Sequence, residues 1–92
     1  MAFVVLDVRS PAEYAAGHLR GAVNLDISDP KFQERLNLLS RSDGYAVYCM
    51  GGRRAGRARD AMEGLGFTDV ASYSMHGAQV ATRLPIITTW ET

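Results

Sequence analysis

Two short apolar runs constrain what this chain can fold into. Residues 3–8 (Phe-Val-Val-Leu-Asp-Val) and 45–48 (Tyr-Ala-Val-Tyr) are nearly continuous in apolar character rather than alternating with polar residues. Such runs are typical of strands buried on both faces, as in parallel sheets. Weaker strand patterns lie at residues 22–25 and 69–73. Helical patterns separate them, so the sequence predicts an α/β fold with a largely parallel sheet of about four to five strands flanked by helices.

A capping box marks the start of the first helix. Ser10 and Glu13 lie three residues apart, with Pro11 at the first helical position. The Ser10 and Glu13 side chains are therefore expected to bind amides that have no partner inside the helix. Gly17 is expected to end this short helix.

Further helices are expected along the chain. Asp29-Pro30 predicts the N-cap of the second, and residues 53–65 form the third, with Gly66 as its C-cap. A last short helix over residues 78–82 and an extended tail over residues 84–90 complete the order. The apolar stripes comprise Phe32, Leu36 and Leu39 in the second helix, and Ala55, Ala58, Met62 and Leu65 in the third.

Composition limits the class of protein. The 92 residues are 47% hydrophobic and 22% charged, and the net charge is zero, so we expect one globular domain over residues 1–92. This balance gives no overall preference for nucleic acid or for an anionic membrane. No apolar run approaches the ~20 residues of a membrane span, and the first residues do not form a signal peptide. A cytoplasmic location is the expectation.

Cysteine and histidine usage excludes several kinds of site. Cys49 is the only cysteine, so the chain can form no internal disulfide and no zinc site built on several thiolates. His76 has no second candidate ligand, so neither a metal nor another cofactor is expected.

The residues around Cys49 form the most informative stretch. Cys49 ends a predicted buried strand, and Gly51 and Gly52 lead from it into the third helix. Ligands of parallel α/β sheets bind beyond the carboxyl ends of the strands, where this cysteine lies. Four of the ten basic residues lie in the same place, within seven positions: Arg53, Arg54, Arg57 and Arg59.

This arrangement favours a reactive thiolate, the nucleophilic form of cysteine. The glycines allow the loop from Met50 to Arg53 to curl its amides around the sulfur, and the next helix points its N-terminus at the same place. The same amides would hold an anionic substrate. The simpler alternatives are an inert buried cysteine and, for Arg57 and Arg59, a solvated helix face.

Three motifs in series resemble the rhodanese (sulfurtransferase) family. Residues 6–14 and 17–25 are similar to its N-terminal signature, D-V-R-x-x-x-E-(Y/F) followed by G-H-I-x-G-A-x-N. Residues 47–55 resemble its catalytic loop, Y-C-x-x-G-x-R-(S/A), and residues 65–70 match its L-G-F-x-x-V motif. The resemblance implies a rhodanese-like three-layer fold.

The resemblance also implies a chemistry. Cys49 would accept a sulfane sulfur as a persulfide from thiosulfate or another small anionic donor. It would pass that sulfur to cyanide in vitro or to an external thiol such as glutathione or a thioredoxin-like protein. Arg54 would position or neutralise the donor, Arg53 would assist, and Arg57 would add positive charge. The backbone of Met50, Gly51 and Gly52, with that of both arginines, would cradle the outer sulfur.

Two other functions stay open. Cysteine phosphatases and arsenate reductases of the Cys-x5-Arg type need arginine six positions after cysteine, where this chain has Ala55. Arg54 lies five positions after Cys49, which gives a loop suited to a single sulfur atom rather than a phosphate. A persulfide carrier or non-catalytic binding module, docked through the basic residues, is the other alternative.

Four further residues have structural readings beside functional ones. Asp7 and Arg9 either line the site or form a buried pair that holds adjacent loops together. Glu13 is expected to be the capping-box acceptor and is a candidate ion-pair partner of Arg9. His18 is expected to be structural, because a persulfide transfer between anions needs no general base.

The chain departs from the family pattern at both ends. Relatives usually carry a strand and a helix before the first motif, and Ile86 to Trp90 is a candidate to cover the sheet edge left exposed. Near the C-terminus, His76 and Ala81 stand where the family has glycine and tryptophan. Packing over residues 75–92 is therefore open, as are the physiological donor and acceptor, the pathway, the oligomeric state and the natural start.

Overall fold

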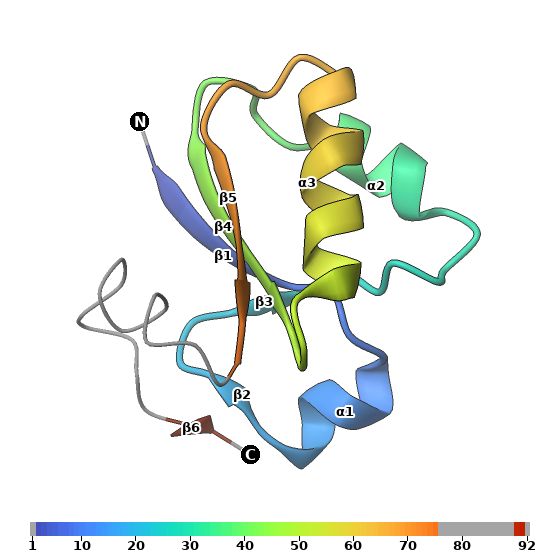
Figure 1. Ribbon diagram of the computed structural model, residues 1–92, viewed down its shortest axis with the longest axis vertical. Coiled ribbons are helices and arrows are strands. Elements are labelled where there is room, and N and C mark those ends of the chain that lie inside the picture. The colour runs from blue at the N-terminus through green and yellow to red at the C-terminus, as the bar shows by residue number, and fades with distance from the viewer. Residues whose placement is uncertain (1, 76–89, 92) are drawn as a thin grey trace.

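Strands and helices alternate through the described part of this computed structural model, residues 2–75 and 90–91 (Figure 1). No helix in these residues combines the length and apolar character needed to cross a membrane. The elements in chain order are β1 (Phe3–Asp7), α1 (Pro11–Ala16), β2 (His18–Leu19), β3 (Val23–Asn24), α2 (Phe32–Asn37), β4 (Gly44–Cys49), α3 (Arg53–Gly64), β5 (Val70–Ser74) and β6 (Trp90–Glu91).

The main sheet has four parallel strands in the order β3-β1-β4-β5. In the centre, β1 pairs with β4 from Phe3↔Gly44 to Asp7↔Tyr48. All six residues of β4 are buried, because strands flank it on both sides and packed layers cover both faces. The prediction of an α/β fold with a parallel sheet is confirmed, and the four main strands lie within two residues of their predicted positions.

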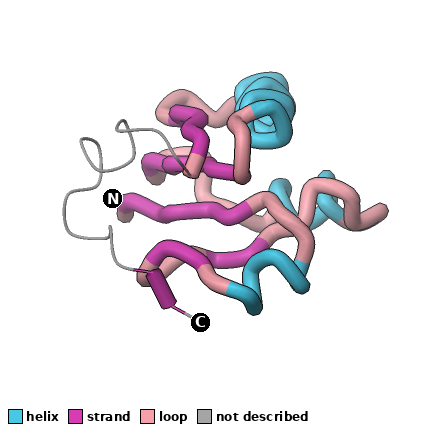
Figure 2. Tube along the Cα trace, turned by 60° about the horizontal axis from the view of Figure 1, so that its bottom comes forward, coloured by secondary structure: helices cyan, strands magenta, loops and turns pink. Residues whose placement is uncertain are grey.

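Alternation along β1 and β4 divides the core between the two faces of the sheet. Leu6 and Val47 belong to the larger apolar cluster, which includes residues of α2 and α3. Figure 2 shows the strands of the sheet side by side, with helices packed against them. Val5, Ala46 and Tyr48 point to the opposite face, where they pack with residues of α1 and β2 and the turn that follows. Cys49 belongs to the larger cluster, so it faces α3.

Local sequence signals determine where the first and third helices begin and end. Ser10 and Glu13 form the predicted capping box at the start of α1. Leu65 is the C-cap of α3, and the predicted glycine Gly66 is the next residue, with a φ of 97°. The Phe67 amide then donates to the Met62 carbonyl at 3.1 Å, which is the bond of a Schellman motif.

Two expectations about local structure need correction, and one short strand was not predicted. The N-cap of α2 is Lys31 rather than Asp29, whose carboxylate instead accepts from the Lys31 amide at 2.9 Å in the preceding turn. The strand β2 was not predicted, because two residues carry no periodic signal. Trp90 pairs with Leu19 of β2 in a separate antiparallel ladder, so it does not cover the edge of the main sheet.

The remaining predictions for the C-terminal part lie outside the described residues. They concern the helix over residues 78–82 and the tail over residues 84–89, together with the roles of His76 and Ala81.

Two leucines of the α2 region provide a test of this packing. Leu36 is fully buried in the larger cluster, whereas Leu38 is 86% exposed at the end of the same helix. Leu36→Ala should lower the free energy of unfolding by about 3 kcal/mol, because it removes a buried side chain and leaves a cavity. Leu38→Ala should change it by less than about 0.5 kcal/mol. Chemical denaturation of both variants measures the difference, and equal losses would contradict this account of the core.

Candidate active site

The thiol of Cys49 lies at the carboxyl end of β4, where the chain turns into α3. The residue is only 1% exposed, and its side chain packs among residues of the larger cluster. The Met75 amide donates to the Cys49 carbonyl at 2.9 Å, which ties the start of the loop to the end of β5. Packing against the sheet and α3 therefore holds the Cys49 sulfur in place.

Two backbone amides donate to the Cys49 sulfur. The Gly52 amide lies 3.0 Å from Sγ and the Ala55 amide 3.3 Å from it. Ala55 is in the first turn of α3, where amides have no partner within the helix. These donors and the positive end of the helix favour negative charge at Sγ. The amides of Gly51, Arg53 and Arg54 donate to no other described residue.

Gly52 gives the loop its shape. It is the N-cap of α3 and has a φ of 98°, a conformation that side chains rarely adopt. A Cβ built on it would lie 3.6 Å from Cβ of Ser74, which is an ordinary contact. The requirement for glycine at this position is therefore set by the backbone conformation rather than by space. Gly51 differs, because it is not among the glycines with a positive φ, and a Cβ there would also meet nothing within 4 Å.

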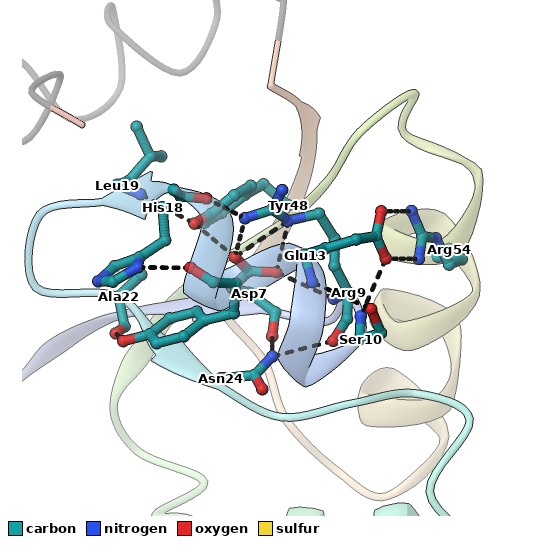
Figure 3. A network of polar contacts seen from close by, with 12 residues as sticks. Asp7, Arg9, Ser10, Glu13, His18, Leu19, Ala22, Asn24, Tyr48 and Arg54 are labelled. Carbon is teal, nitrogen blue, oxygen red and sulfur yellow. Dashed lines mark hydrogen bonds and ion pairs between the residues drawn. The ribbon is translucent and has the colours of Figure 1, made fainter. Parts of the chain in front are cut away.

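Arg54 closes the loop by pairing with Glu13 (Figure 3). Its Nη1 lies 2.8 Å from Oε1 of Glu13, and its Nη2 lies 3.1 Å from Oε2, which gives a two-bond fork. The same Oε1 accepts from the Ser10 amide at 3.0 Å. The capping box of α1 is thus joined directly to the first turn of α3.

This pair changes the protonation equilibrium of both groups. The hydrogen bonds from Arg54, followed by that from the Ser10 backbone, lower the pKa of Glu13 to about 2. The hydrogen bonds to Glu13 raise the pKa of Arg54, and the neighbouring Cys49 acts in the same direction. The sequence suggested Arg9 as the ion-pair partner of Glu13, whereas the structure pairs this carboxylate with Arg54.

Asp7 and Arg9 lie in a buried network at the end of β1 (Figure 3). Their side chains pair at 2.6 Å, and Arg9 also donates to the Gly17 carbonyl at 2.7 Å. The Tyr48 hydroxyl donates to Asp7 at 2.8 Å and accepts from the Leu19 amide at 3.0 Å. These contacts join β1, β4, β2 and the end of α1.

Two groups of this network have a raised pKa. The hydrogen bonds to Asp7 raise the pKa of Arg9, and burial raises the pKa of Tyr48. The Tyr48 phenol therefore stays neutral, and none of the polar contacts named here for Asp7, Arg9 and Tyr48 is made with Cys49.

His18 has a packing environment of its own. Its ring stacks on Tyr14 with centroids 3.7 Å apart, and its Nδ1 lies 2.9 Å from the Tyr14 carbonyl oxygen. The Tyr14 hydroxyl donates to the Ala22 carbonyl at 2.6 Å. These contacts connect α1 with the turn between β2 and β3.

The remaining basic residues differ in their surroundings. Arg53 and Arg57 are exposed and form no ion pair with another described residue. Arg59 donates to the Ser72 hydroxyl of β5 at 3.0 Å and pairs with Asp60 at 3.2 Å. Met50 is 39% exposed at the start of the loop.

The structure thus gathers Cys49 with the predicted loop from Met50 to Arg54. Sequence reasoning missed two contributors to this site, the Ala55 amide and the Glu13 carboxylate. The position of Ala55 in the first turn of a helix contained the signal for its amide. The pairing of Glu13 with Arg54 had none, because 41 residues separate them.

Comparisons with known proteins agree on one family. The family model for Rhodanese-like domains matches residues 2–77. Thiosulfate sulfurtransferase PspE of Escherichia coli is 32% identical over 65 residues, which are 71% of this chain and 62% of that protein. A tRNA uridine(34) hydroxylase of Pelagibacter ubique is 36% identical over 75 residues, which are 80% of this chain and 24% of that protein.

A solved structure has the same fold. A rhodanese with anions from E. coli aligns with a TM-score of 0.64 and 32% identity, covering 75% of this chain and 81% of that one. The present chain spans less than two thirds of the length of either curated relative.

The two loop glycines provide a matched pair of variants. Gly52→Ala should lower the free energy of unfolding by about 1 to 2 kcal/mol, because a side chain at a φ of 98° is strained. Relief of that strain should move the amide off Sγ and change the alkylation rate of Cys49. Gly51→Ala should leave both quantities near wild type. Denaturation and iodoacetamide labelling measure them, and an unaffected Gly52→Ala protein would refute the argument from conformation.

The Glu13–Arg54 pair predicts a specific response to acid. Because the folded-state pKa of Glu13, about 2, lies below its ordinary value of 4.5, the stabilisation is present above pH 4.5 and is lost as the pH falls toward 2. Glu13→Gln should therefore lose less stability than wild type over that interval and be less stable at pH 7. Denaturation at several pH values tests this, with Glu34→Gln on the exposed side of α2 as the control. Parallel curves for wild type and Glu13→Gln would contradict it.

Proposed function

The chain belongs to the Rhodanese-like domain family, and from that premise we propose that it is a sulfurtransferase that carries a sulfane sulfur on Cys49. The observation that carries the proposal is the pair of amides, from Gly52 and Ala55, that donate to the Cys49 sulfur at the end of β4. They support an anionic sulfur as thiolate and leave neighbouring amides for the sulfur added to it. The sulfurtransferase name of the E. coli relative supports the same reaction class.

The first half-reaction loads the protein. The Cys49 thiolate attacks the outer sulfur of thiosulfate, the bond between the two sulfurs of thiosulfate breaks, and sulfite leaves with the electron pair of that bond. The product is a Cys49 persulfide, and the total charge is the same on both sides. The amides of Gly51, Arg53 and Arg54, which donate to no other described residue, are the donors that we propose for the outer sulfur.

The second half-reaction unloads the protein. A thiolate or cyanide attacks the outer sulfur, the sulfur–sulfur bond breaks, and Cys49 departs as thiolate with that electron pair. A thiol becomes a persulfide, and cyanide becomes thiocyanate. Because Cys49 is the only cysteine, no second thiol of the chain can resolve the persulfide, and the acceptor is external.

The positive charges have unequal roles in this proposal. Arg54 is held by Glu13, so its main role is to fix the end of the loop. The exposed Arg53 and Arg57 have no ion-pair partner among the described residues and are the cations that we assign to attracting the anionic donor.

The loop favours sulfur chemistry over phosphoryl chemistry. A Cys-x5-Arg phosphatase needs an arginine where this chain has Ala55, whose side chain is fully buried. The Ala55 amide is instead directed at the Cys49 sulfur. These observations support a loop that holds one sulfur atom rather than a phosphate.

A persulfide carrier for a partner protein is the second candidate. The exposed Met50, three residues before the exposed Arg53, favours it, since an exposed apolar side chain near a charged one is suited to a protein contact. In either case we propose that residues 1–92 act as one domain, in a reducing compartment such as the cytoplasm that supplies the thiol acceptor.

Intact mass spectrometry tests the proposal. The reduced protein should gain the mass of one sulfur atom after treatment with thiosulfate and lose it on addition of cyanide, with thiocyanate formed. Cys49→Ser should gain nothing, because a hydroxyl at this position does not form the persulfide. No gain with thiosulfate, mercaptopyruvate or polysulfide would refute the sulfurtransferase. Loading without turnover on small acceptors would favour the carrier.

A further inference from the structure

The Glu13–Arg54 pair lies at the loop around the Cys49 sulfur. Arg54 is in the first turn of α3, and the next residue is Ala55, whose amide donates to that sulfur at 3.3 Å. Glu13 is the main cause of the raised pKa of Arg54, and Cys49 contributes to it as well. Because an electrostatic interaction acts on both partners, a change of charge at this pair is also felt at the sulfur.

The carboxylate of Glu13 cancels the charge of this arginine. Both Nη atoms of Arg54 donate to it, at 2.8 and 3.1 Å (Figure 3). Since the pKa of Glu13 is lowered to about 2 by these bonds, the carboxylate is ionised throughout the neutral range. The pair therefore has no net charge. The first turn of α3 consequently presents less positive charge to an anion than its two arginines would give alone.

The pair remains within reach of a ligand. The side chain of Arg54 is 30% exposed and that of Glu13 is 34% exposed. The fork with Glu13 uses two of the five N–H groups of the guanidinium, and the others donate to no oxygen of another described residue. An anion that reaches the loop thus meets an accessible guanidinium whose charge is already balanced.

Charge separates two sulfur donors of similar shape. Thiosulfate is a dianion, and replacement of one of its terminal oxygens by a methyl group gives methanethiosulfonate, a monoanion. A nearby cation attracts the dianion about twice as strongly as the monoanion. An arginine with no carboxylate beside it would therefore favour thiosulfate, whereas a balanced pair brings the two donors closer together.

We propose that Glu13, as a positioning residue for Arg54, sets the charge preference for the sulfur donor and keeps the Cys49 site open to monoanionic donors as well as to thiosulfate. The inference rests on the proposed sulfurtransferase function and concerns its first half-reaction. The Cys49 thiolate attacks the sulfane sulfur of methanethiosulfonate, the sulfur–sulfur bond breaks, and methanesulfinate leaves with the electron pair of that bond. The product is the same Cys49 persulfide, and the total charge is unchanged.

The two donors and one change of charge test the proposal. Glu13→Gln keeps a hydrogen-bond acceptor for Arg54 but removes the negative charge. The ratio of the loading rate with thiosulfate to that with methanethiosulfonate, measured by intact mass at low salt, should rise about threefold to fivefold over wild type, the scale of one exposed charge pair. High salt should reduce this rise. Glu13→Asp keeps the charge, so its ratio should stay near wild type.

Two controls separate charge from structure. Glu34→Gln removes the same charge from an exposed site on α2 and should leave the ratio unchanged. The double variant Glu13→Gln with Arg54→Gln has the net charge of wild type, so its ratio should return close to the wild-type value. Because both donors are measured on the same preparation, the ratio does not depend on the fraction of protein that is folded.

The outcomes distinguish this inference from the function on which it rests. A ratio that is unchanged or falls in Glu13→Gln would overturn the role of Glu13, even where both loading rates fall together. Wild-type protein that is loaded by thiosulfate but not by methanethiosulfonate would also overturn it. Wild-type protein that gains no sulfur from either donor would instead overturn the sulfurtransferase itself.

Discussion

The burial of β4 between two parallel neighbours is the constraint on which the other features depend. All of its residues are buried, so its course through the sheet is fixed by hydrogen bonds on both edges and by packing on both faces. Because its last residue is Cys49, the sulfur is placed by the most constrained part of the fold. The loop and helix that follow need only turn the chain, and the Gly52 and Ala55 amides then reach the sulfur as a consequence of that turn.

The two sets of polar contacts at the ends of the strands connect different elements of the fold. The buried network of Asp7, Arg9 and Tyr48 holds the ends of β1 and β4 together and faces inward. The Glu13–Arg54 pair holds the loop that follows β4 to the start of α1, at a more exposed place. A carboxylate used twice, as helix cap and as ion-pair partner, links the geometry of one helix to the geometry of the next. The loop around the sulfur is thus supported from both of its ends.

Sequence patterns were sufficient for the architecture because the relevant signals are local. Continuous apolar runs marked β1 and β4, a capping box marked α1, and a glycine marked the end of α3. The same reasoning placed Cys49 at a strand end and the loop beside it. It did not find the pairing of Glu13 with Arg54, because these two residues are far apart in the sequence and only the folded chain brings them together. The two-residue strand β2 was not predicted either, because it is too short to show a periodic pattern.

The near-complete burial of Cys49 has a consequence for which of two sulfurs is attacked. A persulfide offers an acceptor two electrophilic atoms. Attack on the inner one releases hydrosulfide and leaves a mixed disulfide, whereas attack on the outer one transfers the cargo. Here the inner sulfur would be the Cys49 Sγ, packed in the core and covered by two amides, so an incoming thiolate meets only the outer atom. In the proposed reaction, burial of Cys49 would thereby direct attack to the outer sulfur and keep the protein from forming a mixed disulfide with the acceptor.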